Sequence, residues 1–446
     1  MNITIFTIGS RGDVQPYVAL GRRLQSAGHR VAIATYAYYR DFIEAYGLVI
    51  RPFPGNPQEL MSSSIAREWV SSQKNPVRFI RSFIELTKTQ LEPMFSVGTG
   101  ICADADLILY SDLGLVGQHM AEYFDTPSIQ THLQPFGLTR EFPAVGSPPW
   151  LRLGGTYNRF SHLLTDQVMW QPFRSHVNEW RQAQLRLPPA PFFGPYRQLK
   201  KKQQPVFSAF SPTVVPKPAD WASWHHVTGY WFLPPPPGWT PPQDLVDFIQ
   251  AGPPPVYIGF GSMYDGNPHA LTQMVLSAVQ RAGVRVVLSS GWGGFAAADL
   301  PENAFVLSSI PHEWLFPNMA AVVHHGGAGT TAAGLRAGVP NIVVPYFADQ
   351  YFWGKRVHRL GVGPKPIARQ RLNEDRLTAV LQQATQSATM KQQAADIGRR
   401  IRAEDGTGVA LSLIERYMEQ GIVTGVQKRW RPVPRSPRLR RYLRFR

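Results

Sequence analysis

The amino-acid sequence predicts an α/β protein with two doubly wound parallel sheets, one in each half of the chain. Short apolar runs alternate with helical patterns in the first half, and the alternation restarts after a proline-rich stretch at 234–255. Such alternation is typical of βα units, in which helices cover both faces of a parallel sheet. A chain of 446 residues also exceeds one ordinary core. We therefore expect two tandem Rossmann-like domains that face each other across a cleft.

The first half begins directly with a strand pattern. The expected strands are Ile3–Gly9, Val31–Thr35, Leu48–Pro52, Asp106–Tyr110, Ser128–His132 and Val206–Phe210. A helix is expected from about Val14 to Ala27, because Gly28 is a natural C-cap glycine. Segments 57–100 and 150–200 are rich in aromatic residues and interrupt the alternation. We expect these two segments to be mostly helical or irregular.

Two proline clusters mark the boundary between the domains. Pro234–Pro237 and Pro253–Pro255 bracket a stretch that cannot be central sheet and that suits a stiff spacer. The expected strands beyond it are Val256–Gly259, Val284–Leu288, Phe305–Ser308, Ala321–His324 and Asn341–Pro345, with helices at about Pro268–Ala282, at Thr330–Ala337 and from Gln350. We place the domains at 1–233 and 256–420, and we expect the last helix to return to the first domain.

The charge is concentrated in a tail at 421–446. From Lys428 onward the chain carries nine Lys and Arg and no acid, out of a net charge of +16. The body is therefore only mildly basic, and its charge does not indicate a specific nucleic-acid partner. Aromatic and leucine side chains alternate with the cations, which suits an anionic membrane surface. A solvated tail, or one that touches nucleic acid non-specifically, remains an alternative.

Three further absences in the sequence bear on location and chemistry. Cys102 is the single cysteine, so the chain can form neither an intramolecular disulfide nor a thiolate metal site. The sequence shows no signal-peptide pattern and no apolar run of about 18 residues. We expect a cytoplasmic protein, peripheral on the membrane if the tail binds it.

The most informative motif runs from Val322 to Gly354. A strand ends at His324-His325, and a turn containing Gly326, Gly327 and Gly329 opens a helix at Thr330. Small residues let the backbone approach a phosphate, and the free N–H groups of the helix stabilise its charge. The alternative is a tight strand-to-helix turn in which Thr330 is only an N-cap.

Asp349 and Gln350 follow the next strand in the same way. A carboxylate and an amide at the mouth of the cleft suit the vicinal hydroxyls of a sugar. Alternatively, Asp349 only caps the following helix.

The Val322–Gly354 stretch resembles the nucleotide-sugar signature of family 1 glycosyltransferases, most closely the branch of sterol 3-beta-glucosyltransferases and glycopeptide-antibiotic glycosyltransferases. The matching residues read HHGGAGTTAAGLRAGVP followed by a DQ and an FWG. Further segments resemble the same branch: Gly9–Pro16, Gly259–Met263, Ser290–Gly294 and Pro311–Pro317. The resemblance covers roughly residues 1–420 and implies the two-domain fold called GT-B.

The resemblance also implies roles for individual residues. His325 would contact the diphosphate of the donor, and Asp349 and Gln350 would hold its sugar. Ile310 and His312 would lie along the nucleobase. The remaining donor-binding residues implied are Ser10, Arg11, Gly12, Ser262, Trp292, Gly327, Gly329 and Thr330.

The implied activity is an inverting, metal-independent transfer of a hexose, with glucose from UDP-glucose as the expected donor and a lipophilic alcohol as the acceptor. No cofactor is expected beyond the UDP-sugar co-substrate. A UDP- or dTDP-sugar transferase acting on a polyketide or other secondary metabolite is the alternative enzyme. A catalytically silent sugar-nucleotide-binding or membrane-adaptor protein is the non-enzyme alternative.

Asp13 is the candidate catalytic base, in the loop after the first strand. A carboxylate at a cleft is a plausible base because partial burial raises its proton affinity. The alternative is that Asp13 caps the helix and only orients the acceptor. Asp112, His132, Gln134 and Phe136 follow neighbouring strands and are expected to line the acceptor site, although Asp112 could be a helix cap and His132 a structural histidine.

Aromatic residues in the first half suggest an apolar acceptor pocket. The candidates are Trp69, Phe79, Phe83, Phe136, Phe142, Trp150, Phe160 and Trp170. Aromatics in such segments are more often core than pocket.

Overall fold

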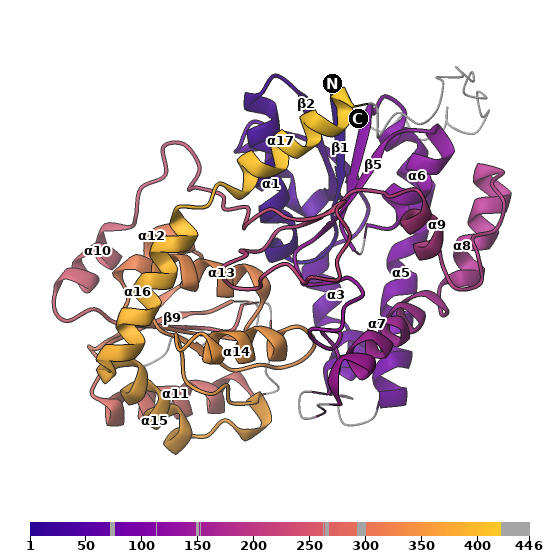
Figure 1. Cartoon of the computed structure of the whole chain (residues 1–446). Coiled ribbons are helices and arrows are strands. Elements are labelled where there is room, and N and C mark those ends of the chain that lie inside the picture. Colours follow the sequence, from indigo (N-terminus) through magenta and orange to yellow (C-terminus); the bar gives the residue numbers. More distant parts are fainter. Residues whose placement is uncertain are drawn as a thin grey trace.

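A computed structural model describes residues 1–71, 76–112, 114–148, 151, 153–261, 263, 267–291 and 300–420. Two parallel sheets with helices on their faces form the architecture, so the predicted α/β class is confirmed (Figure 1). The first sheet has the order β3-β2-β1-β4-β5-β6-β7 and the second β10-β9-β8-β11-β12. In both, the strand order reverses beside the first strand, which is where α/β sheets bind ligands.

The strands have the following bounds: β1 Asn2–Phe6, β2 Arg30–Tyr36, β3 Val49–Phe53, β4 Leu107–Tyr110, β5 Ser128–His132, β6 Val206–Ser208, β7 His225–Val227, β8 Val256–Gly259, β9 Val286–Ser289, β10 Ala304–Leu307, β11 Ala321–His324 and β12 Asn341–Val343. Eleven of these overlap the predicted strands. The exception is β7, a short polar strand that forms by pairing with β6 in parallel. Its existence depends on that partner, because three residues give no periodic pattern of their own.

The helices of the first half are α1 Arg11–Ser26, α2 Arg40–Glu44, α3 Pro57–Ser62, α4 Ser64–Ser71, α5 Pro76–Cys102, α6 Val116–Phe124, α7 Gly154–Trp170, α8 Arg174–Trp180 and α9 Tyr196–Lys201. The aromatic-rich segments 57–100 and 150–200 are therefore largely helical where the structure describes them. They cover the first sheet and extend its core, in which Phe95 stacks on Trp180 at a ring distance of 4.1 Å.

The helices of the second half are α10 Gln243–Gln250, α11 Pro268–Ala282, α12 His312–Leu315, α13 Ala328–Ala337, α14 Gln350–Arg359, α15 Glu374–Gln386, α16 Ala388–Arg402 and α17 Gly406–Glu419. The first of them, α10, lies inside the proline-bracketed stretch 234–255. Leu245 of α10 is fully buried against the second sheet, beside Tyr257 and Val287. The stretch is thus partly a packed helix, because Leu245, Phe248 and Ile249 give it an apolar face.

The last helix lies against the first sheet, although α16 before it covers the second (Figure 1). Ala410, Leu413 and Ile414 of α17 belong to the core that contains β1 and α1. His226 Nε2 and Tyr417 Oη add a hydrogen bond of 2.8 Å. The chain therefore crosses between the two units a second time, at residues 403–406.

Contacts between the two units surround this second crossing. Ser211 Oγ donates to Glu404 Oε1 at 2.6 Å, and the Arg356 guanidinium donates to the Val214 carbonyl. Phe142 meets Phe352 edge-on at 5.7 Å. No helix among the described residues is long and apolar enough to span a bilayer.

Candidate active site

The N-termini of α1 and α13 face each other across the space between the two sheets. Each helix follows a central strand through a glycine with positive φ, Gly9 at +132° and Gly326 at +92°. A Cβ atom placed on Gly329 would lie 3.8 Å from the Gly12 carbonyl oxygen. Free backbone N–H groups and helix dipoles therefore converge from both sides on one point, an arrangement suited to an anion.

Both helices begin earlier than the sequence indicates. The first starts at Arg11 and not near Val14, with Ser10 as its N-cap. The second starts at Ala328 with Gly327 as its N-cap, so Thr330 is not a cap. The capping role considered for Thr330 is thus wrong, and phosphate binding by this turn stays a prediction.

His325 and Thr331 carry polar atoms that have no partner in the part of the chain that the structure describes. His325 Nδ1 and Thr331 Oγ1 are buried and make no hydrogen bond among the described residues. Burial first, and then the neighbouring His324 and His312, lower the pKa of His325 to about 3. Buried polar atoms without partners are costly unless a ligand or water satisfies them. The sequence analysis missed Thr331 as a site residue.

A second group of predicted donor residues lies beside this point. Arg11 reaches across the cleft, and its Nη1 donates to Ser309 Oγ at 3.3 Å. His312 stacks on Phe316 at 4.2 Å, and burial together with the charge of Arg11 lowers its pKa to about 3. Ile310 is partly buried next to them. Ser262 and Trp292 lie outside the described residues.

Asp349 lies at the start of α14 and faces the first unit. Its Oδ2 accepts a hydrogen bond of 3.1 Å from Trp353 Nε1 and makes no side-chain cap. The pKa of Asp349 is raised to about 6, because burial and the charge of Asp13 together outweigh the opposing hydrogen bonds from Trp353 and Gln134. Asp13, Gln134 and Asp349 therefore meet across the cleft.

Gln350 is buried and already bonded. Its Oε1 accepts from the backbone N–H groups of Tyr346 and Phe347, at 2.7 and 3.2 Å. Its Nε2 lies 3.4 Å from the Met263 sulfur. These bonds hold the loop before α14, which supports Asp349, and a direct contact between Gln350 and a sugar stays a prediction.

Asp13 both caps α1 and faces the cleft. Its Oδ2 accepts from the Ser10 N–H at 2.8 Å and from the Ser10 hydroxyl at 2.9 Å. Its Oδ1 accepts no hydrogen bond from the described residues. Burial raises the pKa of Asp13; the bonds from Ser10 oppose this rise and the charge of Asp112 adds to it. One oxygen is thus fixed by the cap while the other stays available, as a proton acceptor requires.

Asp112 and His132 form a pair next to Asp13. Asp112 Oδ1 bonds to His132 Nδ1, and Phe136 lies edge-on to the same imidazole at 5.7 Å. The cap alternative for Asp112 is wrong, because α6 begins at Val116 with Leu115 as its N-cap. The structure thus brings three of the predicted acceptor residues together.

Asp166 on α7 is a carboxylate that the sequence analysis missed. Burial raises its pKa to about 7; the nearby His132 opposes this rise and Asp112 adds to it. No strand precedes Asp166, so no motif marked it. The acceptor side therefore holds a third carboxylate beside Asp13 and Asp112.

Replacing Asp166 with asparagine is expected to stabilise the protein at high pH. The pKa of Asp166 in the folded protein lies above the ordinary 3.8, so the folded state binds the proton more tightly than the unfolded state does. Ionising Asp166 therefore lowers the free energy of unfolding, and this loss grows as the pH rises from about 4 to 7. Allowing for solvent screening, Asp166→Asn should gain about 1–2 kcal/mol at pH 8 and much less at pH 5. Thermal unfolding at both pH values measures this, and an equal gain at the two would contradict it.

The predicted acceptor aromatics divide into two groups. Trp170 is core, because it is 2% exposed and its Nε1 donates to the Phe192 carbonyl. Phe160 is 59% exposed and points away from the interior. Neither lines the cleft as expected. Trp150 and the side chains of Trp69, Phe79 and Phe83 lie outside the described residues.

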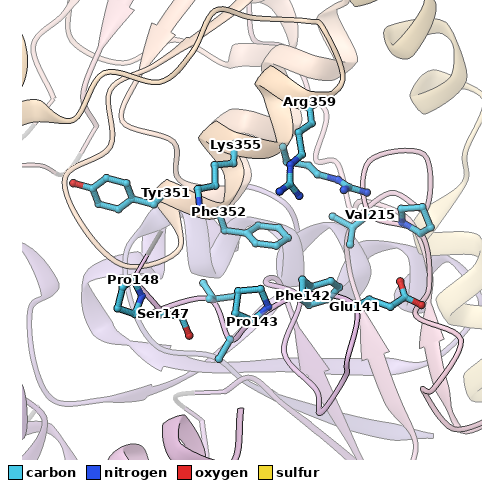
Figure 2. A pocket seen from close by; sticks show the side chains of 14 residues that line it. Glu141, Phe142, Pro143, Ser147, Pro148, Val215, Tyr351, Phe352, Lys355 and Arg359 are labelled. Carbon is cyan, nitrogen blue, oxygen red and sulfur yellow. The ribbon is translucent and has the colours of Figure 1, made fainter. Parts of the chain in front are cut away.

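A pocket lies between α14 and the segment after Phe136 (Figure 2). Its lining residues are Glu141, Phe142, Pro143, Ala144, Val145, Ser147, Pro148, Val215, Pro216, Tyr351, Phe352, Lys355, Arg356 and Arg359. Apolar walls come from both units, and the cations of α14 lie along one side. The pocket begins two residues beyond Asp349 and thus adjoins the cleft.

Two family domains match this chain. Residues 3–143 match the glycosyltransferase family 28 N-terminal domain, and residues 273–414 match the C-terminal domain of erythromycin biosynthesis protein CIII-like proteins. The glycosyltransferase of kitacinnamycin covers 93% of this chain and 98% of its own with a TM-score of 0.69 at 20% identity. The calicheamicin glycosyltransferase has a TM-score of 0.67 at 17% identity, with 94% and 98% coverage. The chain therefore has the GT-B fold and is similar to glycosyltransferases over both of its halves.

Relatives with higher identity are named sterol 3-beta-glucosyltransferases. The Neosartorya fischeri protein is 39% identical over 94% of this chain, and the Cryptococcus neoformans protein is 38% identical over 94%. The aligned region is 30% of the first protein's length and 27% of the second's. The chain thus spans less than a third of the length of these relatives.

Proposed function

We propose that this chain transfers a hexose, most simply glucose from UDP-glucose, to a hydroxyl group of a lipophilic acceptor in the interdomain cleft, with inversion at the anomeric carbon. The proposal is carried by the approach of the N-termini of α1 and α13 to each other. The buried Nδ1 of His325, just before α13, has no partner among the described residues, and Asp13 and Asp349 lie close enough to interact. A diphosphate would satisfy the helix N-termini and His325, and a sugar with its acceptor would satisfy Asp13 and Asp349.

In the proposed reaction, the first unit removes the proton of the acceptor and the second unit stabilises the leaving group. The acceptor oxygen attacks the anomeric carbon and gives its proton to Asp13 Oδ1, while the bond from that carbon to the β-phosphate oxygen breaks. Attack from the side opposite the leaving UDP inverts the configuration. The N–H groups of α13 and His325 stabilise the charge on the departing diphosphate, which is the work a divalent cation does elsewhere. The reaction is therefore expected to continue in the presence of a chelator.

The comparisons are compatible with two donors, UDP-glucose and a dTDP-sugar. The sterol relatives are named glucosyltransferases, whereas the neighbouring structure of VinC, with a TM-score of 0.62 at 20% identity, contains dTDP. Asp349 suits the hydroxyl groups of a hexose, and this supports a glucose donor. A dTDP-sugar and a polyketide acceptor form the alternative. A binding protein without activity would release no UDP from any donor.

Mass spectrometry of product mixtures tests the proposal. Reactions contain UDP-glucose, other UDP-sugars or dTDP-glucose, each with a panel of sterols and polyketide alcohols. The expected product is an acceptor that gains one hexose from UDP-glucose in the presence of EDTA. UDP or dTDP release without any glycosylated acceptor would contradict the proposed acceptor class.

We further propose that the tail from Lys428, which lies outside the described residues, brings the protein to an anionic membrane from the cytoplasm. Its nine cations should each contribute about 1 kcal/mol at low salt. Co-sedimentation with phosphatidylglycerol vesicles should be stronger for the full chain than for one stopped before Lys428, and high salt should weaken it. Equal pelleting of the two chains, or indifference to lipid charge, would contradict a role of the tail.

A further inference from the structure

An apolar surface lies on the outside of α7, away from the cleft. Ten large hydrophobic side chains are strongly exposed among the described residues, and six of them belong to α7, the residue before it and one nearby loop. They are Leu153, Phe160, Leu163, Leu164, Phe192 and Phe193, with exposed fractions of 47–64%. We call this set the α7 surface. Scattered exposed leucines are ordinary, but a concentration of this kind indicates a binding partner.

The side chains of the α7 surface have defined positions, which are set by their spacing along the helix and by hydrogen bonds to the backbone of the loop. Phe160, Leu163 and Leu164 lie three and four residues apart, so they share one face of the helix. The loop with Phe192 and Phe193 is fixed beside the same helix, because Trp170 Nε1 donates to the Phe192 carbonyl at 3.0 Å. Gln167 Nε2 donates to the Phe193 carbonyl at 3.2 Å. The loop therefore presents its phenyl rings at a defined place.

The segment that carries the α7 surface has an excess of positive charge. Residues 140–220 contain eleven Lys and Arg and four acids, of which Asp220 interacts with Arg159. Asp166 faces His132 and Asp112 on the inner side. Arg174 lies over the Phe192 ring at 4.5 Å, and Arg159 is exposed on α7. An exposed apolar face flanked by cations matches an anionic bilayer, whose headgroups attract the cations while apolar side chains enter the interface.

The opposite face of α7 closes the acceptor side of the cleft. His162 is buried and its Nε2 bonds to the Phe142 carbonyl at 3.0 Å, and Asp166 lies near the His132–Asp112 pair. One helix thus separates the α7 surface from the proposed acceptor site. A lipophilic acceptor released from a membrane at this surface would travel only the width of a helix.

We propose that the α7 surface binds the interface of an anionic lipid bilayer, independently of the tail, and that the acceptor enters from there. Entry of the acceptor from this surface rests on the proposed function, since it assumes a lipophilic acceptor, whereas binding of the bilayer does not.

Vesicle binding of full-length variants tests the proposal. Phe160→Ser with Leu164→Ser changes the helix, and Phe192→Ser with Phe193→Ser changes the loop. Each double variant is expected to lower the partition coefficient onto phosphatidylglycerol vesicles at least tenfold. The matched control is Val409→Ser, at a hydrophobic residue of α17 that is 44% exposed, and it should bind as the unchanged protein does.

Two further measurements separate the possible outcomes. Thermal unfolding and UDP affinity should be equal in all variants, because the substituted side chains are exposed and distant from His325. Unchanged vesicle binding in both double variants would overturn the proposal. So would sedimentation showing a dimer that the double variants dissociate, because the α7 surface would then bind a second copy. A failure of UDP binding in the unchanged protein would instead count against the proposed function.

Discussion

Replacing Asp13 with asparagine is expected to lower kcat by about 10²–10⁴-fold while the protein folds normally. The asparagine carbonyl can still accept from the Ser10 N–H and hydroxyl, as the Oδ2 atom does at 2.8 and 2.9 Å. The capping contact of α1 therefore survives, and only the proton acceptor is lost. Initial rates at saturating donor and acceptor measure the effect.

A matched control separates the role of Asp13 in capping α1 from its role as a proton acceptor. Ser10→Ala removes the hydroxyl bond but leaves the Asp13 carboxylate, so it should cost stability and little activity. UDP affinity should be close to normal in the Asp13→Asn variant. Turnover of the Asp13→Asn variant within a few-fold of the unchanged enzyme would reduce Asp13 to a capping and orienting residue.

Replacing His325 with alanine is expected to weaken UDP binding by about 1.5–3 kcal/mol, a factor of roughly 10 to 150. The imidazole Nδ1 is buried and has no partner among the described residues, so we expect a diphosphate oxygen to satisfy it. Isothermal calorimetry with UDP measures the loss directly. The carboxyl group of Asp349, in contrast, is placed for the sugar.

Asp349→Ala is the matched control for the His325 variant. It should leave UDP affinity unchanged and lower turnover of UDP-glucose, because UDP lacks the hexose. Unchanged UDP affinity in His325→Ala would show that the diphosphate lies elsewhere. Equal losses of UDP affinity in both variants would show a general disturbance of the second unit.

The regular part of the fold was predictable from local patterns. Buried parallel strands such as β1 and β11 are continuous apolar runs, and the glycines that follow them mark sharp turns into helices. Features that depend on distant partners were not predictable. Strand β7 exists because β6 is beside it, and helix α10 packs on β8 and β9 in a stretch whose prolines indicate only a spacer.

In the candidate site too, some residues could be identified from local patterns and others only from the three-dimensional structure. His325, Asp13 and Asp349 follow strand ends, where parallel sheets gather functional residues, and the sequence identified them. Thr331 and Asp166 lie within helices, so no strand end marked them. The bonds that occupy Gln350 come from backbone N–H groups four and three residues earlier, and only three-dimensional structure reveals that use. Trp170 shows the converse, since an aromatic residue in a helical segment became core.

The most direct test of the account is a crystal structure of the full chain with UDP. We expect the diphosphate at the N-terminus of α13, with an oxygen in hydrogen-bond contact with His325 Nδ1 and the uracil along Ile310. The pocket beside α14 offers an anion a competing place, since Arg356 and Arg359 line it. UDP bound there, without contact to His325 or to the N-terminus of α13, would contradict the account.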